Sequence, residues 1–385
     1  MTDSKMNSTI RIVEAIGIAL EGKLNFAAWR LPDAGEARLS VQSDDRLEAV
    51  PDLDALIAKG GFVVAPFRSD AEGGRFAIMP DILMDGQVDE GQMAAIRSFA
   101  KVRRGKEGGA EARSIARGST FAVSRDEYLD QARRVVAAIR TGDFDKVVLS
   151  RVKEIRGDYR PRLAEIFDRL CKAYPSAFVY LFNAKGQCWV GATPEALLCS
   201  KGERLSTVSL AGTRPYAEEN LDLALWNGKE RAEQDYVTRQ IEGILKDFRV
   251  GDVTKKGPYA RRAGALLHLC SEFSFPYRSI APRLGAFVDS LHPTSAVCGI
   301  PKKDAMELIA SVERHDRGFY SGYIGPVDRE KGVQLFVNLR CMRVFPDRLA
   351  LLVGGGITAE SVPEDEWEET EMKSGTLLSV IKEFS

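Results

Sequence analysis

Two pairs of glutamates at helical spacing are candidates for metal binding. Glu230 and Glu233 lie three residues apart in one predicted helix, and Glu366 and Glu369 repeat that spacing in another. Residues three apart share one helix face, so each pair projects its carboxylates in one direction. Two such faces opposite each other would offer the oxygen ligands that Mg²⁺ prefers. A solvated helix face explains either pair taken singly, because charged side chains rarely leave the surface, so the spacing alone does not establish a metal.

One carboxyl group and one amine lie at the ends of apolar strands. Glu195 follows the apolar stretch 188–192 and Pro194, and apolar surroundings would raise its pKa until it can act as a general acid. Lys146 opens an apolar strand, where loss of solvent would lower the pKa of its amine and allow it to act as a base. The alternatives are a glutamate in the first turn of a helix and an edge-strand lysine that discourages aggregation.

A glycine run follows another apolar strand at 354–356. Backbone N–H groups there could approach an anion closely, although a tight turn without a ligand explains the run equally well. The nucleotide-binding motif G-x-G-x-x-G, the P-loop, the G-x-S-x-G elbow and the H-E-x-x-H zinc motif are all missing. Three histidines in 385 residues also disfavour a poly-histidine metal site.

The composition excludes several classes of protein. The formal charge is −1, so no bulk field attracts nucleic acid or an anionic membrane. The longest apolar runs, such as 349–353, fall far short of the roughly 20 residues of a membrane-spanning helix. The N-terminal residues lack the features of a secretory signal. The six cysteines form no C-x-x-C pair, which is typical of reduced thiols, so we expect a cytoplasmic protein.

Hydrophobic periodicity and turn residues predict mixed secondary structure. Residues 1–100 read as short strands and loops, and 101–118 form a basic, glycine-rich connection. A capping box from Ser124 to Glu127 starts a helix that ends at Gly142. Further helices are predicted at 162–173, 220–247, 302–314 and 364–384. Strands are predicted at 146–155, 177–182, 188–191, 322–325, 332–344 and 348–354. The hairpin turns between these strands favour antiparallel pairing.

Several motifs occur in a fixed order after residue 120. They are KVVLSR at 146–151, GATPE at 191–195, LAGTRP at 210–215, KERAE at 229–233, LHPTSA at 291–296, RGFYSG at 317–322, NLR at 338–340, GGGI at 354–357 and EWEET at 366–370, followed by Lys373. Together they resemble the chorismate-utilising enzymes, which include isochorismate, salicylate, anthranilate and aminodeoxychorismate synthases. The resemblance covers about 120–385, and so many ordered motifs make chance agreement very unusual.

The resemblance implies an α+β fold, a two-layered antiparallel β-sandwich with helices outside. Residues 1–118 would contribute to the same body as a chorismate-binding catalytic domain at 119–385. Glu233 and Glu369 would hold Mg²⁺, supported through water by Glu230 and Glu366, and the metal would grip the ring carboxylate of chorismate. The positions that match substrate-binding residues of the family are Gly212, Thr213, His268, Thr294, Tyr320, Arg340, Gly355 and Lys373.

Variable positions of the family indicate the reaction. Lys146 matches the base of the water-using members, where ammonia users typically have Gln, and Ala211 replaces the lysine nucleophile of aminodeoxychorismate synthases. The resemblance therefore implies an isochorismate synthase, in which Lys146 deprotonates the water that attacks C2 and Glu195 protonates the departing C4 hydroxyl. Ala296 and Val297 favour isochorismate over salicylate as product. Tyr320 occurs in salicylate formers and in the isochorismate synthases of menaquinone synthesis, so we expect that pathway rather than siderophore synthesis.

Three alternatives remain open at this stage. The chain could be a salicylate synthase, which also eliminates pyruvate from bound isochorismate. It could bind chorismate without catalysis, although each proposed catalytic position holds a competent residue. It could also transfer an amine with the help of a separate glutaminase subunit. We expect no glutaminase partner, and a monomer or weak dimer.

Overall fold

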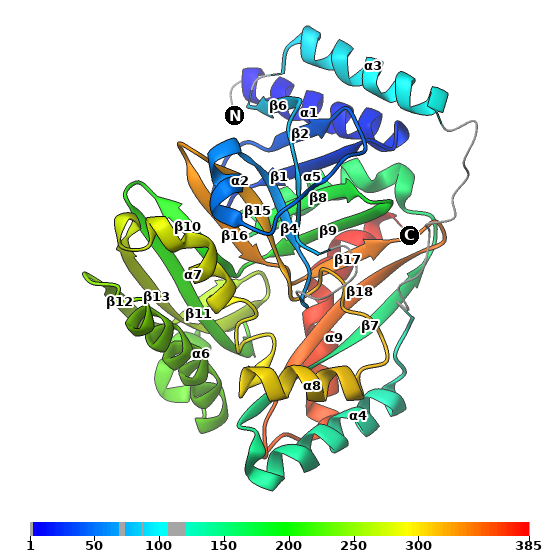
Figure 1. The fold of residues 1–385 in the computed structure, drawn as a ribbon. Coiled ribbons are helices and arrows are strands. Elements are labelled where there is room, and N and C mark those ends of the chain that lie inside the picture. The colour runs from blue at the N-terminus through cyan, green and yellow to red at the C-terminus, as the bar shows by residue number, and fades with distance from the viewer. Residues whose placement is uncertain (1–2, 69–73, 87, 107–120, 385) are drawn as a thin grey trace.

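The computed structural model describes residues 3–68, 74–86, 88–106 and 121–384. Its strands form two nine-stranded sheets packed against each other, with helices on the outer faces (Figure 1). All strand pairs are antiparallel. The predicted α+β sandwich of antiparallel sheets is therefore confirmed.

Each sheet combines strands from distant parts of the chain. The order in sheet A is β14 (Gly299–Ile300), β7 (Lys146–Arg156), β18 (Arg348–Ile357), β17 (Cys341–Val344), β9 (Gln187–Thr193), β8 (Phe178–Ala184), β1 (Asn25–Arg30), β2 (Arg38–Gln42) and β6 (Ile82–Asp85). The order in sheet B is β12 (Thr254–Ala263), β13 (Leu266–Pro276), β11 (Arg204–Pro215), β10 (Ala196–Lys201), β16 (Gly332–Val337), β15 (Tyr323–Asp328), β4 (Gly61–Ala65), β5 (Phe76–Ile78) and β3 (Glu48–Ala49).

Aromatic side chains fill the space between the two sheets. Phe178 of sheet A and Phe336 of sheet B stack with ring centroids 4.2 Å apart and planes 3° from parallel. Trp29 and Phe62 make a second contact between the sheets, with centroids 5.3 Å apart. Aromatic side chains bury large apolar areas and add favourable ring contacts, so this layer holds the sheets together.

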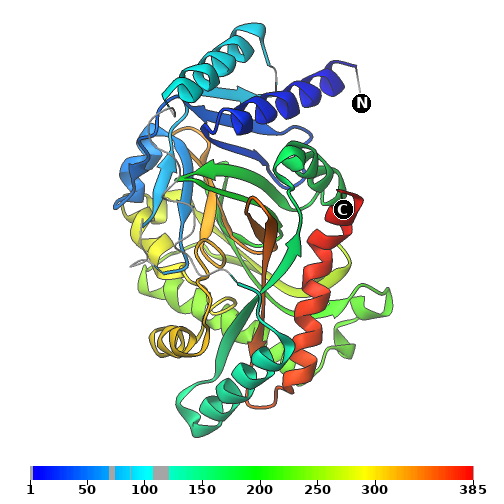
Figure 2. The same cartoon turned by 90° about the vertical axis from the view of Figure 1, so that its right-hand side faces the viewer.

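Helices cover the remaining apolar faces. Sheet A packs against α1 (Asp3–Glu21), α3 (Glu90–Lys106), α5 (Leu163–Ala173) and α9 (Pro363–Ile381), and sheet B against α2 (Leu53–Lys59), α6 (Gly228–Asp247) and α7 (Leu284–Leu291). Two more helices, α4 (Arg125–Ala138) and α8 (Lys302–Val312), share a separate apolar cluster with β7 and β18. Figure 2 shows the long α9, in red, running down the side of the molecule.

Two negative findings concern the described residues. All six cysteines are free thiols. Among the helices of the described ranges, none combines the length and the apolar character that a bilayer span requires.

Helix starts follow capping chemistry. The helix predicted to start at Ser124 does start there as α4, and one half of the predicted capping box is present, because the Ser124 hydroxyl accepts from the Glu127 amide at 3.2 Å. The long helix predicted at 220–247 starts later, at Gly228, because Asn227 and Glu230 form a capping box that the sequence analysis overlooked. Residues 219–225 before it form short 3₁₀ turns instead.

The prediction for the first 100 residues was wrong in part, since α1, α2 and α3 accompany the strands there. Ile12, Ala15, Ile16 and Ala19 of α1 are buried at helical spacing, a periodicity that the short-strand interpretation missed. The strands from this region extend both sheets. Of the predicted connection 101–118, residues 101–106 continue α3, and the rest lies outside the described residues.

The single strand predicted at 332–344 is two strands in different sheets. The chain leaves sheet B after Val337 and enters sheet A at Cys341, and Arg340 between them has a left-handed backbone with φ 47°. The buried Asn338 holds this crossover. Its Oδ1 accepts from the Tyr180 hydroxyl at 2.6 Å, and its Nδ2 donates to the Phe319 carbonyl at 2.8 Å.

We predict that Asn338→Ala destabilises the protein by about 1–3 kcal/mol for each buried group left unpaired. The measurement is urea unfolding followed by circular dichroism. Tyr180→Phe removes only one of the two hydrogen bonds and should cost less. Combining both changes should cost less than the sum, because no unpaired hydroxyl remains. A loss below about 0.5 kcal/mol in Asn338→Ala would contradict this role.

Candidate active site

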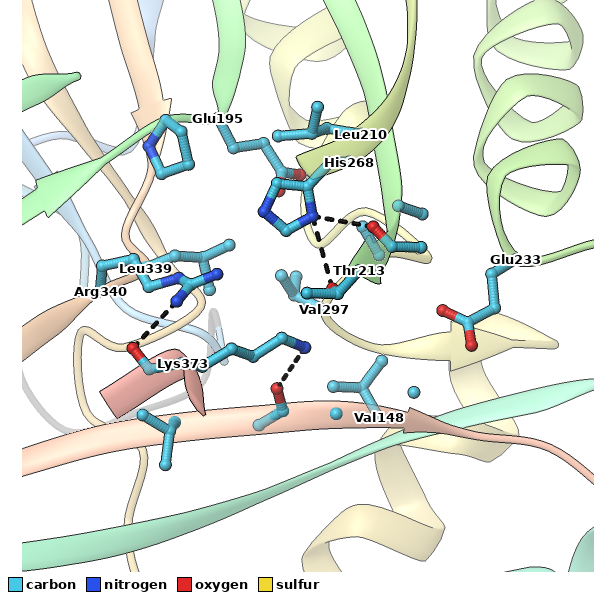
Figure 3. A pocket seen from close by; sticks show the side chains of 18 of the residues that line it. Val148, Glu195, Leu210, Thr213, Glu233, His268, Val297, Leu339, Arg340 and Lys373 are labelled. Atoms are coloured by element: carbon cyan, nitrogen blue, oxygen red, sulfur yellow. Dashed lines mark hydrogen bonds between the residues drawn. The ribbon is translucent and has the colours of Figure 1, made fainter. Parts of the chain in front are cut away.

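A cavity of about 80 Å³ lies where the two sheets meet. Residues of β18, in sheet A, and of α9 form part of its wall. It brings together most of the predicted site residues, namely Lys146, Glu195, Gly212, Thr213, Glu233, His268, Tyr320, Arg340, Gly355 and Lys373. Figure 3 shows many of these side chains pointing into one space from several elements. The other predicted residues, Thr294, Glu230, Glu366 and Glu369, do not line it.

Lys146 is buried at the first position of β7, with only 2% of its surface exposed. It is not on an edge strand, because β14 pairs with β7 at this residue and β18 pairs on the other side. Its Nζ lies 3.7 Å from Oε2 of Glu233. A Cβ at Gly356 would come within 2.5 Å of the lysine side chain, so the glycine run makes room for this amine.

Glu195 lies between β9 and β10, not in a helix, and is 4% exposed. Its carbonyl accepts from the Val337 amide at 2.9 Å, which ties the β9–β10 connection to β16. Burial raises the pKa of its carboxyl to about 8, against the opposing charges of Lys146, Lys373 and Arg340. The group is therefore mostly protonated at neutral pH, which is the form a general acid needs.

His268 of β13 is a neutral hydrogen-bond acceptor inside the cavity. Burial, together with the charge of Arg340, lowers its pKa to about 3. Its Nδ1 lies 2.8 Å from the Gly212 carbonyl, which fixes the proton on Nδ1. Its Nε2 is buried without a partner, so it is left to accept a hydrogen bond from a bound molecule.

Two cations form the opposite wall (Figure 3). The Arg340 guanidinium donates to the Lys373 carbonyl at 2.9 Å and to Thr376 Oγ1 at 3.2 Å, and it forms no ion pair with any described residue. Burial lowers the pKa of Arg340 to about 10. The Lys373 amine donates to the Gly354 carbonyl at 3.0 Å and pairs with Glu369. A buried guanidinium without a carboxylate partner favours the binding of an anion.

The four predicted metal ligands are held by other groups in this structure. Glu230 accepts from Arg214 and completes the capping box of α6. Glu366 accepts from Lys229 and from Ser361. Within the ranges that the structure describes, no three His, Cys, Asp or Glu side chains gather closely enough to hold a metal ion. Magnesium binding therefore stays a prediction.

The donor chemistry nevertheless fits a hard cation. Oε2 of Glu366 is buried without a partner, and burial together with the neighbouring Glu369 raises the pKa of that carboxyl. Burial by itself would lower the pKa of the Lys229 amine. The negative charges of Glu366, Glu233 and Glu369 outweigh burial, so the pKa is raised. Three of the four predicted ligands thus act on one ammonium group. An oxygen-only set of this kind suits Mg²⁺.

Several residues of the site were not singled out from the sequence. The cavity has apolar walls that include Val148, Leu210, Leu339 and Leu352. Val148 could have been found, because it lies two residues after Lys146 in one strand and so faces the same side. Arg317 lies outside the lining, but it donates to the carbonyls of Val148 at 2.7 Å and Val297 at 2.8 Å. It thereby fixes two wall segments.

Thr294 supports the site from outside the cavity. Its carbonyl accepts from the amides of Val297 and Cys298, each at 3.0 Å. This turn carries Ala296 and Val297 to the cavity wall.

Comparison with known proteins gives the family. The model described as chorismate binding enzyme matches residues 52–382. The chain belongs to this family. A candidate isochorismate synthase of Mycobacterium tuberculosis, MenF, is 35% identical over 66% of this chain and 72% of its own. Isochorismate synthase EntC of Escherichia coli is 32% identical over 64% and 65%. Anthranilate synthase component 1 of Aeropyrum pernix is 32% identical over 68% and 61%.

Solved structures described as isochorismate synthases show the same fold. A candidate 2,3-dihydroxybenzoate-specific isochorismate synthase, DhbC of Bacillus anthracis, superimposes with a TM-score of 0.73 at 19% identity, over 95% of this chain and 99% of that chain. Among the relatives, isochorismate and anthranilate synthases match at similar identities. The comparisons thus show the family.

We predict that Glu195 makes stability depend on pH. The ordinary pKa of the carboxyl is 4.5 and the folded value is about 8. The stability that this proton confers is fully present below about pH 4.5 and is lost as the pH rises through about 8. Urea unfolding at pH 5, 6.5 and 8 should show Glu195→Gln gaining stability relative to the natural chain as the pH rises. The exposed Glu203→Gln is the control, and parallel profiles for all three proteins would contradict the prediction.

Proposed function

We propose that this chorismate binding enzyme is an isochorismate synthase, which converts chorismate to isochorismate. The observation that carries the proposal is that a buried amine and a buried, protonated carboxyl line one cavity with anion-binding groups. Water addition and hydroxyl loss need both a base and an acid at the same ring. The isochorismate synthases among the relatives support this choice.

The anion-binding groups would orient the substrate, which carries two carboxylates. Arg340 and Lys373 would bind them, together with the backbone at Gly355, as the family resemblance implies. The neutral His268 would accept a hydrogen bond from a hydroxyl through Nε2, because this atom lacks a partner. Positioning of this kind removes much of the entropic barrier to reaction.

In the proposed reaction, Lys146 takes a proton from the water molecule that adds to C2. The ring double bonds shift, the C4–oxygen bond breaks, and Glu195 gives its proton to the departing hydroxyl, which leaves as water. One water enters and one leaves, so the product is an isomer of the substrate. Each proton-transfer group should contribute about 10²–10⁴ in rate.

Mg²⁺ is part of the proposal. Glu233 and Glu369 would hold it, with Glu230 and Glu366 in support through water. When bound, the ion would neutralise the ring carboxylate and fix its position. Supporting features are the partnerless Oε2 of Glu366 and the carboxylates that share Lys229.

The alternatives differ in the nucleophile or in a further step. Lys146 and Ala211 both disfavour amine transfer, so we propose no glutaminase partner. We also propose that the protein is a monomer or weak dimer. Salicylate formation would require elimination of pyruvate from the bound product. The small apolar Ala296 and Val297 at the wall favour release of isochorismate. Tyr320 favours menaquinone over siderophore synthesis as the destination of the product.

The test is incubation of the pure protein with chorismate and separation of the products. We expect isochorismate without salicylate or pyruvate. Lys146→Gln should reduce turnover by at least about 10²-fold, because the base is lost. Lys153→Gln, a half-exposed lysine on the same strand, serves as the control and should retain activity. Undiminished turnover in Lys146→Gln would refute the assigned base, and anthranilate formation with ammonia would refute the proposed reaction.

We predict that turnover stops when EDTA removes divalent ions and returns when Mg²⁺ is added. Glu366→Gln should weaken Mg²⁺ binding by about 10–100-fold, as is typical for groups that support metal ligands. Isothermal titration calorimetry measures this without any need for activity. Glu368→Gln, exposed on the same helix, is the matched control. Equal Mg²⁺ affinity in the Glu366 and Glu368 variants would contradict the assignment.

A further inference from the structure

A second, larger cavity adjoins the candidate active site. It measures about 330 Å³ and lies between the β12–β13 hairpin, the connection from α5 to β8, and α9. Arg340 and Pro194 line both cavities. Ligand sites in proteins typically measure about 300–1,000 Å³, so this space is large enough for a small organic molecule.

The charges around this cavity all have one sign. Arg261, Arg262 and Arg340 line it, and none of the described lining residues is Asp or Glu. Arg262 stacks on the Tyr216 ring at 3.7 Å and donates to the Gly264 carbonyl. The half-buried Arg261 donates to the Cys270 sulfur at 4.0 Å. None of the three arginines forms an ion pair with any described residue.

Arg261 lies on the strand next to the one that carries His268 of the active site. It lies directly opposite His268 in the β12–β13 pair, so the two side chains share one face. The apolar residues Ala177, Ala192 and Pro194 also line this cavity. Unpaired guanidinium groups beside an apolar wall suit a molecule with a carboxylate at one end and a ring at the other.

We propose that the second cavity is a binding site for a ring-bearing monocarboxylate, held by Arg261 and Arg340. A carboxylate there would engage the guanidinium that the proposed function assigns to the substrate. Its occupant would therefore compete with chorismate for Arg340 and inhibit turnover. The binding itself does not depend on the proposed function, whereas the inhibition rests on it.

The test titrates the full chain with benzoate, using benzamide as the uncharged control of the same shape. Benzoate should bind, and benzamide at least about tenfold more weakly, because the amide lacks the charge. Arg261→Gln should weaken benzoate binding by about tenfold or more. Ala263→Leu, which narrows the cavity from the hairpin, should also weaken it. Lys373 lines only the active-site cavity, so Lys373→Gln should weaken benzoate binding less than Arg261→Gln does.

The opposite pattern would overturn the proposal. If Lys373→Gln weakens benzoate binding and Arg261→Gln does not, the ligand lies in the active site instead. Equal binding of benzoate and benzamide would also refute a carboxylate site. If the protein forms isochorismate, benzoate should raise the apparent KM for chorismate in the natural chain but not in Arg261→Gln. If it forms none, the proposed function fails while the binding comparison still decides this proposal.

Discussion

The site depends on one constraint, which is that charged and titratable side chains are buried together between the two sheets. Lys146, Glu195, His268 and Arg340 are each less than 10% exposed. Removing such groups from water disfavours their charged forms, which explains a protonated Glu195 and a neutral His268. The surrounding fold has to supply the hydrogen bonds and opposite charges that water would otherwise provide.

The fold meets this requirement with buried polar networks. Asn338 holds the crossover between the sheets by hydrogen bonds to Tyr180 and Phe319. Arg317 pairs with Glu313 and bonds two carbonyls of the cavity wall. These buried residues are far from solvent, and a site built on them is positioned before any ligand arrives. Tyr180 and Phe319 also belong to the aromatic layer between the sheets, which supports the Asn338 network.

The unpaired positive charge of Arg340 links the two cavities. A guanidinium that is buried without a carboxylate costs free energy in the empty protein, and a bound anion would reduce that cost. The active site and the second cavity both present this group. An anion in one cavity therefore changes the electrostatic environment of the other.

Local patterns in the sequence were sufficient for the helix start at Ser124, the strand that starts at Lys146 and the antiparallel hairpins, because these depend on neighbouring residues. The ordered motifs were sufficient for the family and the sandwich. The sequence missed the helices of the first 100 residues and the break between Val337 and Cys341, since long-range packing decides both. It also left Lys146 open as an edge residue, and only the pairing of β14 excluded that.

The sequence by itself determined which chemical groups are present and which family they belong to. Only the tertiary structure decided how those groups behave, because pKa values, ion pairs and cavities arise from residues far apart in the chain. It enclosed Glu195 and raised its pKa, oriented His268 through Gly212, and gave the carboxylates of α6 and α9 a shared lysine. It also placed Arg261 opposite His268, across a β-hairpin whose residue types alone indicate no ligand.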